Sequence, residues 1–443
     1  MRLLESAGLG VLALALASAS TAAQERAANP PPAATCPEAV AAIATCYKTK
    51  LETGAYLLAA VPKNWNGNLI VFAHGGPSVT PPVENDSDDD LAKYSIGVRM
   101  GFAWVASTYR KEGYGVQMAA ADTDDARKFF LERIGKPKRT ILHGASYGGM
   151  VGAKMLETYA ANYDGALFNS GAVSGSIGNY EFRADLRAVY QYYCGNFPAP
   201  TDTQYPLWAG LPAESKLTVK ELTERIDACT GVTKPAEART ATQKKNLADI
   251  LGVMRIPEPL LVRHMQAGAF VFRDIGERIT GGKNPFSNTN IRYWGSSDDA
   301  ALNRGIVRFE ADPAARNALI ADGQPRGAIT VPVISIHSMN DPQAAVEAQS
   351  YYRERVRGAG KANLLVQAYT DERVHVGQSP PEFAASFEAL MQWIEKAIKP
   401  TAQSIAASCG QLRAIYDGPC RYHPDYEPKP LDTRYARSAP ATR

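Results

Sequence analysis

From residue 69 to residue 169, short apolar segments alternate with longer segments that have helical periodicity. The predicted strands are 69–73, 102–106, 139–143 and 167–169, and the predicted helices are 119–133 and 148–159. This alternation is typical of a mostly parallel sheet with helices on its faces. A further strand is predicted at 55–61, and Asn66-Gly67 predicts a β-hairpin between it and 69–73.

The alternation stops after Ser176 and resumes near residue 331. The intervening segment 177–328 contains several predicted helices and few clear strands, and one helix begins at a capping box formed by Thr218 and Glu221. The predicted elements beyond it are strands at 331–336 and 364–368 and helices at 342–356 and 381–398. We therefore expect an α/β fold with a helical cap inserted before the last two strands.

The start of the chain has the pattern of a signal peptide. Arg2 is followed by an apolar run at 8–17 and by small residues up to 21–23. A membrane anchor is the alternative, but it needs about 20 apolar residues. We therefore expect an exported protein, secreted or periplasmic, without a stable membrane anchor. The expected organisation is a signal peptide (1–23), a leader (24–53), the α/β core in two parts (54–176 and 329–399), the helical cap or lid (177–328) and a C-terminal extension (400–443).

The cysteines agree with export. They are Cys36, Cys46, Cys194, Cys229, Cys409 and Cys420. Six cysteines allow about 15 pairings, and proximity favours joining each to its nearest neighbour in the sequence. No two lie two to four residues apart as in common zinc sites, so we expect disulfides of an oxidising compartment rather than a metal site.

The charge of the chain excludes one class of partner. The formal net charge is only +3, and no run of Lys or Arg is interleaved with aromatic residues. We therefore expect no nucleic-acid partner. An acidic run at 84–90 (ENDSDDD) has two interpretations, a calcium site and an exposed loop capping a helix from Leu91. The loop is favoured, because the run lacks the Gly and the distal Glu of a recognised calcium loop.

Ser146 is the predicted nucleophile. It lies in Gly144-Ala145-Ser146-Tyr147-Gly148, between a short apolar strand and a helix. A sharp strand-to-helix turn strains the serine backbone, exposes its hydroxyl and leaves no room for side chains on either side, which is why glycines are needed there. An ordinary glycine-rich loop is the alternative interpretation of the motif.

The predicted base is His375, on the loop after the last predicted strand. Asp341 follows the preceding strand and is predicted to orient His375 and to stabilise its imidazolium form. Because Asp341 precedes a proline, an N-cap of the next helix is an alternative role. Asp371, on the same loop as His375, is the weaker candidate for the acid.

The predicted oxyanion hole has two parts. The backbone N–H of Tyr147 follows the nucleophile, and Gly75 or Gly76 in His74-Gly75-Gly76-Pro77 follows an early strand. Glycines let the backbone approach a substrate closely, and losing one oxyanion donor typically costs about 3 kcal/mol. A plain tight turn is the alternative interpretation of these glycines.

Three motifs resemble the catalytic domain of the prolyl oligopeptidase family. They are His74-Gly75-Gly76-Pro77, Tyr109-Arg110 with Gly113-Tyr114-Gly115, and Gly144-Ala145-Ser146-Tyr147-Gly148-Gly149. The first and third are also similar to proline iminopeptidases and secreted esterases. The resemblance implies the α/β-hydrolase fold and the triad named above. From the short predicted leader we expect no propeller domain before the sheet, and no clear acidic pair is present to hold a peptide N-terminus.

These observations favour an exported serine esterase that works through an acyl-enzyme and needs no cofactor. The expected partner is a small-molecule ester or a short peptide. A serine exopeptidase is the alternative, and a non-catalytic binding protein on the same scaffold is a remote one. Aromatic residues of the cap either line an acyl pocket or form the cap's own core: Tyr190, Tyr192, Tyr193, Trp208, Tyr293 and Trp294.

Overall fold

A computed structural model describes residues 30–433, so the predicted signal peptide lies outside the described residues. Eight strands form one sheet in the order β1-β2-β4-β3-β5-β6-β7-β8. Their bounds are β1 Ala44–Lys50, β2 Tyr56–Pro62, β3 Asn68–Ala73, β4 Ala103–Ser107, β5 Arg139–Ala145, β6 Gly165–Asn169, β7 Val333–Ser338 and β8 Leu365–Thr370. The β1–β2 and β2–β4 pairs are antiparallel, and all others are parallel. A mostly parallel sheet with helices inserted between β6 and β7 confirms the predicted α/β-hydrolase fold.

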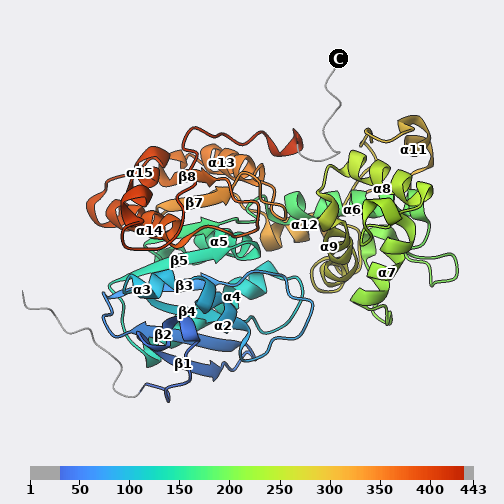
Figure 1. The fold of residues 1–443 in the computed structure, drawn as a ribbon. Helices are drawn as coiled ribbons and strands as arrows, with labels where there is room; N and C mark the ends of the chain where they lie inside the picture. Colours follow the sequence, from blue (N-terminus) through green and yellow to red (C-terminus); the bar gives the residue numbers. More distant parts are fainter. Residues whose placement is uncertain (1–29, 434–443) are drawn as a thin grey trace, which may run out of the picture.

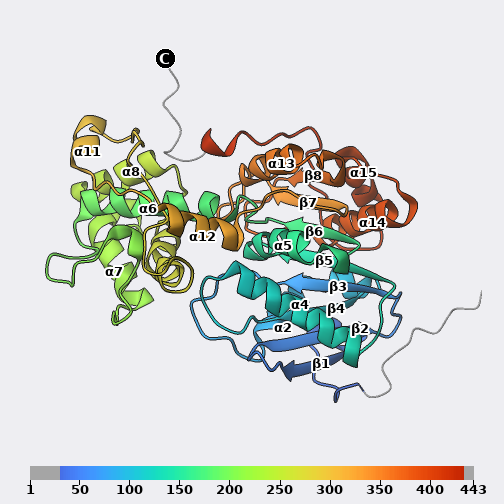
Figure 2. The same cartoon turned by 180° about the vertical axis from the view of Figure 1, so that it is seen from behind.

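Helices cover both faces of the sheet (Figures 1 and 2). One face packs against α4 (Val116–Arg133), α5 (Tyr147–Thr158) and α13 (Ala348–Gly358). The other face packs against α1 (Glu38–Ala41), α2 (Asp86–Lys93), α3 (Ile96–Arg99), α14 (Pro380–Lys396) and α15 (Ala402–Leu412). Neighbouring residues of β3, such as Ile70 and Val71, belong to opposite cores. Burial on both faces explains why the parallel strands are mostly apolar.

The hairpin predicted between the strands at 55–61 and 69–73 is wrong. β2 and β3 do not pair, because β4 lies between them and is hydrogen-bonded to both. The Asn-Gly turn instead contacts the segment before β4, where the N–H of Asn66 donates to the carbonyl of Gly101 over 2.9 Å. The turn therefore reverses the chain without pairing the strands that flank it.

Among the elements that were not predicted from the sequence, β1 and α15 extend the fold at its two ends. β1 lies within the expected leader and forms the edge of the sheet. α15 lies in the C-terminal extension and packs on the other face with α14. The chain after α15 runs back along β8, where the N–H of His423 donates to the carbonyl of Tyr369 over 2.7 Å. It then reaches the helical insertion, where Arg255 donates to the carbonyl of Thr433 over 3.3 Å (Figure 1).

The segment between β6 and β7 forms a helical block beside the sheet (Figure 1). Its α-helices are α6 Gly175–Cys194, α7 Val219–Thr230, α8 Ala241–Met254, α9 Leu261–Gln266, α10 Phe272–Asp274, α11 Asp299–Gly305 and α12 Pro313–Gly323. The predicted capping box is present at the start of α7, where Thr218 and Glu221 satisfy one another's backbone N–H groups. Within residues 30–433, no helix is long and apolar enough to cross a bilayer.

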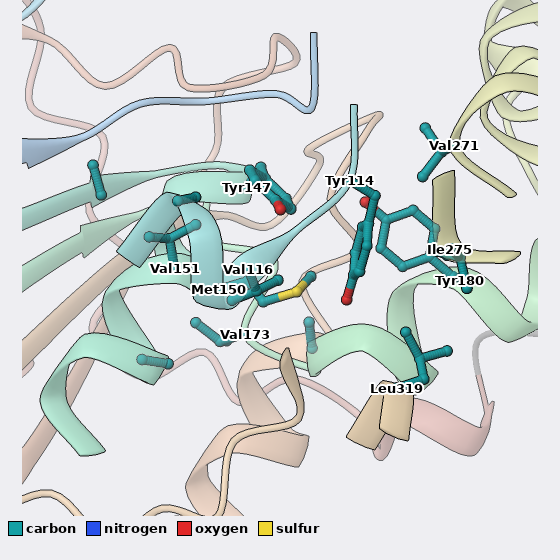
Figure 3. Close-up of a cluster of buried hydrophobic side chains, with 14 of the residues drawn as sticks. Tyr114, Val116, Tyr147, Met150, Val151, Val173, Tyr180, Val271, Ile275 and Leu319 are labelled. Carbon is teal, nitrogen blue, oxygen red and sulfur yellow. The ribbon is translucent and has the colours of Figure 1, made fainter. Parts of the chain in front are cut away.

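The block joins the core through aromatic rings and buried carboxylates. The ring of Tyr114 lies between those of Tyr147 and Tyr180, with centroids 6.2 and 5.1 Å away (Figure 3). From the block, Asp274 accepts the N–H of Tyr114, and Asp322 accepts two N–H groups at the start of α4. A carboxylate at a helix N-terminus satisfies donors that have no partner within the helix. These contacts fix the block against the loop that leads into α4.

Three disulfides join each cysteine to its nearest neighbour in the sequence. Cys36–Cys46 and Cys409–Cys420 close short segments, with sequence separations of 10 and 11. Cys194–Cys229 joins α6 to α7 inside the block. All six cysteines are therefore paired, as the sequence analysis expected.

Candidate active site

Ser146 lies at a sharp turn between β5 and α5, with φ 56° and ψ −120°. This positive φ is unusual for a residue with a side chain. A Cβ on Gly144 would collide with the carbonyl of Gly148, and a Cβ on Gly148 would collide with the carbonyl of Ala73. The two glycines therefore allow the turn to pack tightly against β3, as the motif predicts.

The structure brings the three predicted triad residues together. Nε2 of His375 lies 2.7 Å from Oγ of Ser146. Nδ1 of His375 lies 2.8 and 2.9 Å from the two carboxylate oxygens of Asp341. The residues follow β5, β7 and β8, so neighbouring parallel strands deliver all three side chains to one edge of the sheet. The chain of hydrogen bonds has the geometry that lets a histidine take a proton from a serine.

Asp341 is buried and held in place by the backbone. Its Oδ1 accepts the N–H groups of Gln343 and Ala344, both over 2.9 Å. Burial raises the pKa of Asp341, but the hydrogen bond from His375 and the nearby imidazoles outweigh it, and the pKa is lowered. The carboxylate is therefore ionised where it faces His375. It does not cap the next helix, because α13 begins only at Ala348.

Neither the other histidines nor the alternative acid takes the place of His375 or Asp341, although Nε2 of His337 lies 3.9 Å from Oδ2 of Asp341. Asp371 pairs with His423, 3.2 Å away, instead of His375. His143 is buried among aromatic rings and bonds Asn169. His337 is buried under the triad and bonds the carbonyl of Ala344. His264 lies in the block, on α9.

The predicted oxyanion residues surround the nucleophile. Gly76 and Tyr147 line the same cavity as Ser146 and His375. Tyr147 is the first residue of α5, so its N–H is one of the helix donors without a partner inside the helix. A Cβ on Gly75 would lie 3.9 Å from Cβ of Ser146, which places the Gly75 backbone beside the serine.

Two side chains hold the loop that carries these glycines. The hydroxyl of Tyr109 donates to the carbonyl of His74 over 2.7 Å. The ring of His74 forms an ion pair with Asp90. Burial lowers the pKa of His74, but the hydrogen bond and the charge of Asp90 outweigh it, so the pKa is raised. The loop is therefore positioned from β4 and from α2.

The Tyr109→Phe variant is expected to lower kcat for an ester about tenfold with little change in KM. It removes the hydrogen bond to the His74 carbonyl and leaves the ring in place. The backbone N–H groups of Gly75 and Gly76 are then held less accurately at the position of the oxyanion. Steady-state kinetics measure the effect. A tenfold increase in KM with an unchanged kcat would show instead that Tyr109 supports substrate binding.

Two buried glutamates lie beside the loop of His375. Burial, together with the hydrogen bond and charge of Glu382, raises the pKa of Glu372 to about 7. Arg421, from the C-terminal extension, forms ion pairs with both carboxylates. The arginine therefore ties the C-terminal extension to the loop of His375, where it also donates to the carbonyl of Gly377.

The raised pKa of Glu372 predicts a pH dependence of stability. The folded state binds this proton more tightly than the unfolded state, so its stabilising contribution is full below the unfolded pKa of 4.5 and is lost as pH rises to about 7. The wild type is expected to lose about 2–3 kcal/mol relative to Glu372→Gln across this interval. Urea unfolding at several pH values measures the difference, and parallel curves for the two proteins would contradict it.

A cavity of about 360 Å³ opens beside the triad. Its wall from the helical block includes Asn179, Tyr180, Arg183, Arg263, His264 and Gln266. No sequence motif marks these residues, so they could not be predicted as part of the site. None of the six cap aromatics named above lines the cavity, and Tyr190 and Tyr293 are buried in the core that includes the block. For these two residues, the core interpretation is the one that the structure supports.

The acidic run is a helix and not a loop. Asp86–Lys93 forms α2, so the helix begins five residues before the expected Leu91. Asp88 pairs with Lys48, and Asp90 pairs with His74. Among residues 30–433, no group of three or more His, Cys, Asp or Glu side chains is arranged to hold a metal ion.

No protein-family model matches the chain, and no curated protein matches it in sequence. Among solved structures, the chain is similar to an esterase from Aspergillus oryzae, with 18% identity, a TM-score of 0.42 and coverage of 81% of this chain and 80% of the other. It is also similar to feruloyl esterase B from Aspergillus oryzae, with 14% identity, a TM-score of 0.37 and coverage of 81% and 82%. A third similar structure is Pyrococcus horikoshii acylaminoacyl peptidase, with 12% identity and a TM-score of 0.40. The match covers 82% of this chain and 43% of the peptidase. The strand order and the elbow define the class of the chain as the α/β-hydrolase fold.

Proposed function

We propose that the protein is an exported serine hydrolase that cleaves carboxylic esters through an acyl-enzyme. The observation that carries the proposal is the hydrogen-bonded series Ser146–His375–Asp341 at the mouth of an open cavity. The three disulfides support an oxidising compartment, and hence export. The helical block would act as a cap, since it forms one wall of the cavity.

The proposed reaction has two steps. His375 takes the proton of Ser146 as the serine oxygen attacks the ester carbonyl, and the backbone N–H groups of Tyr147 and Gly76 bind the oxyanion. His375 then gives the proton to the leaving alcohol, and the acyl-enzyme remains. Water, activated by the same histidine, attacks the acyl group and releases the acid and Ser146. Asp341 keeps His375 in the required tautomer throughout.

A serine exopeptidase is the second candidate, and the cavity argues against its aminopeptidase form. An aminopeptidase must hold the ammonium group of a peptide, which needs a nearby carboxylate. Among the described residues that line the cavity, none is Asp or Glu. An ester has no such requirement.

Paired assays test the proposal. The purified mature protein is expected to hydrolyse p-nitrophenyl acetate or butyrate and to leave aminoacyl p-nitroanilides intact. A fluorophosphonate probe is expected to label the wild type and not Ser146→Ala. Cleavage of the anilides at a comparable rate would favour the peptidase, and the absence of both turnover and labelling would favour a non-catalytic scaffold.

A further inference from the structure

The cavity beside the triad has an unusual charge for a site that takes neutral esters. Two arginines and a histidine from the helical block line it, Arg183 on α6 and Arg263 and His264 on α9. Its other polar lining includes the amides of Asn179 and Gln266. With no acidic side chain among its described lining residues, the cavity has a net positive wall facing Ser146.

Arg183 is held in position by several groups. Its guanidinium lies over the rings of Tyr180 and Phe182, 5.1 and 4.7 Å from their centroids. Its Nε donates to Nδ1 of His264 over 3.2 Å, and Nη1 donates to the carbonyl of Asn179. A guanidinium fixed by stacking loses little conformational entropy when it binds a ligand. Arg183 is therefore a pre-positioned cation on the cavity wall.

Arg263 adds a second positive charge to the same wall. It is exposed, and no ion pair joins it to any residue within 30–433. Two guanidinium groups that line one cavity of about 360 Å³ repel one another, and an anion bound between them removes that repulsion. Planar guanidinium groups bind carboxylates in two-pronged hydrogen bonds, which adds direction to the attraction.

We infer that the natural substrate carries a carboxylate close to the scissile ester. This inference rests on the proposed function and names its substrate class: an ester of a dicarboxylic acid or of an alcohol that bears a carboxylate. The reacting carbonyl lies at Ser146, and the free carboxylate lies toward Arg183 and Arg263. The same charge disfavours substrates with a free amine at this position.

Two pairs of esters that differ only in charge test the inference. Mono-p-nitrophenyl adipate and its methyl ester place the charge on the acyl side, and 4-acetoxybenzoate and its methyl ester place it on the alcohol side. The wild type is expected to have a kcat/KM about tenfold higher for the charged member of at least one pair. In Arg183→Gln and in Arg263→Gln, the ratio of charged to neutral kcat/KM is expected to fall about tenfold.

Arg304→Gln is the matched control, because Arg304 is an exposed arginine of the same block on α11 and does not line the cavity. It is expected to leave both the ratio and the activity unchanged. Arg263 is on the surface, so its variant keeps the test valid if Arg183→Gln fails to fold. A preference for the neutral ester in both pairs, or a ratio unchanged in Arg263→Gln, overturns the inference while leaving the esterase proposal intact. Failure of the wild type to hydrolyse any of the four esters overturns the esterase proposal itself.

Discussion

Ser146→Ala is expected to lower kcat/KM for p-nitrophenyl acetate by at least about 10⁴-fold. The change removes the hydroxyl that lies 2.7 Å from Nε2 of His375 and leaves the rest of the cavity in place. Without the hydroxyl, no acyl-enzyme forms, and only the oxyanion donors and substrate positioning contribute to hydrolysis. Steady-state kinetics measure the loss, with thermal unfolding to show that the variant is folded.

Ser215→Ala is a suitable control for this change. Ser215 lies in the helical block, where its hydroxyl accepts the N–H of Leu217, and it does not line the cavity beside the triad. Its activity is expected to equal that of the wild type. A Ser146→Ala enzyme that retained a tenth or so of the wild-type rate would mean that another group is the nucleophile.

Gly148→Ala is expected to lower the free energy of unfolding by about 3 kcal/mol. Gly148 lies within α5, where alanine is normally more favourable than glycine by about 1 kcal/mol. Here alanine is expected to be destabilising, because the added Cβ would meet the backbone carbonyl of Ala73, which cannot rotate away as a side chain does. Activity is expected to fall as well, since any shift of α5 moves Ser146 relative to His375.

Gly410→Ala provides the opposite case. Gly410 is exposed inside α15, and a Cβ there would meet nothing within 4 Å. Alanine is therefore expected to stabilise the protein by about 0.5–1 kcal/mol. Urea unfolding of the two variants measures both effects, and a Gly148→Ala protein as stable as the wild type would show that α5 can move away from β3 without cost.

Sequence patterns located the side chains of the triad because each follows a short apolar strand. In a parallel sheet, the loops that follow the strands meet at one edge, so the sequence alone predicts that Ser146, Asp341 and His375 lie together. Their contacts in the structure are those of the predicted arrangement. Their catalytic roles stay predictions that the variants above test.

Strand pairing was less predictable than strand position. The Asn66-Gly67 turn favours a hairpin locally, but every residue of β4 is buried, and β4 lies inside the sheet, between β2 and β3. β1 contains Lys48, Thr49 and Lys50 and forms the half-exposed edge of the sheet, so its residues lack the apolar run that marks the inner strands. Local turn chemistry and hydrophobicity do not specify which strands become neighbours.

The positive wall of the cavity could not be predicted from the sequence. Arg183 and Arg263 are 80 positions apart, on helices with no motif around either residue. They line one cavity only because α6 and α9 pack against one another, and that packing depends on many buried side chains of the block. Helix periodicity predicts which face of a helix is buried, but not which helix covers it.

None of the three disulfides joins two of the segments that deliver the triad. Each closes a local stretch of chain, with separations of 10, 35 and 11 residues, and none crosses from the helical block to the sheet. The alignment of Ser146, Asp341 and His375 is therefore maintained by packing of the sheet and its helices, without covalent reinforcement. We therefore expect the redox state of the surroundings to affect the stability of the fold more than the rate of turnover.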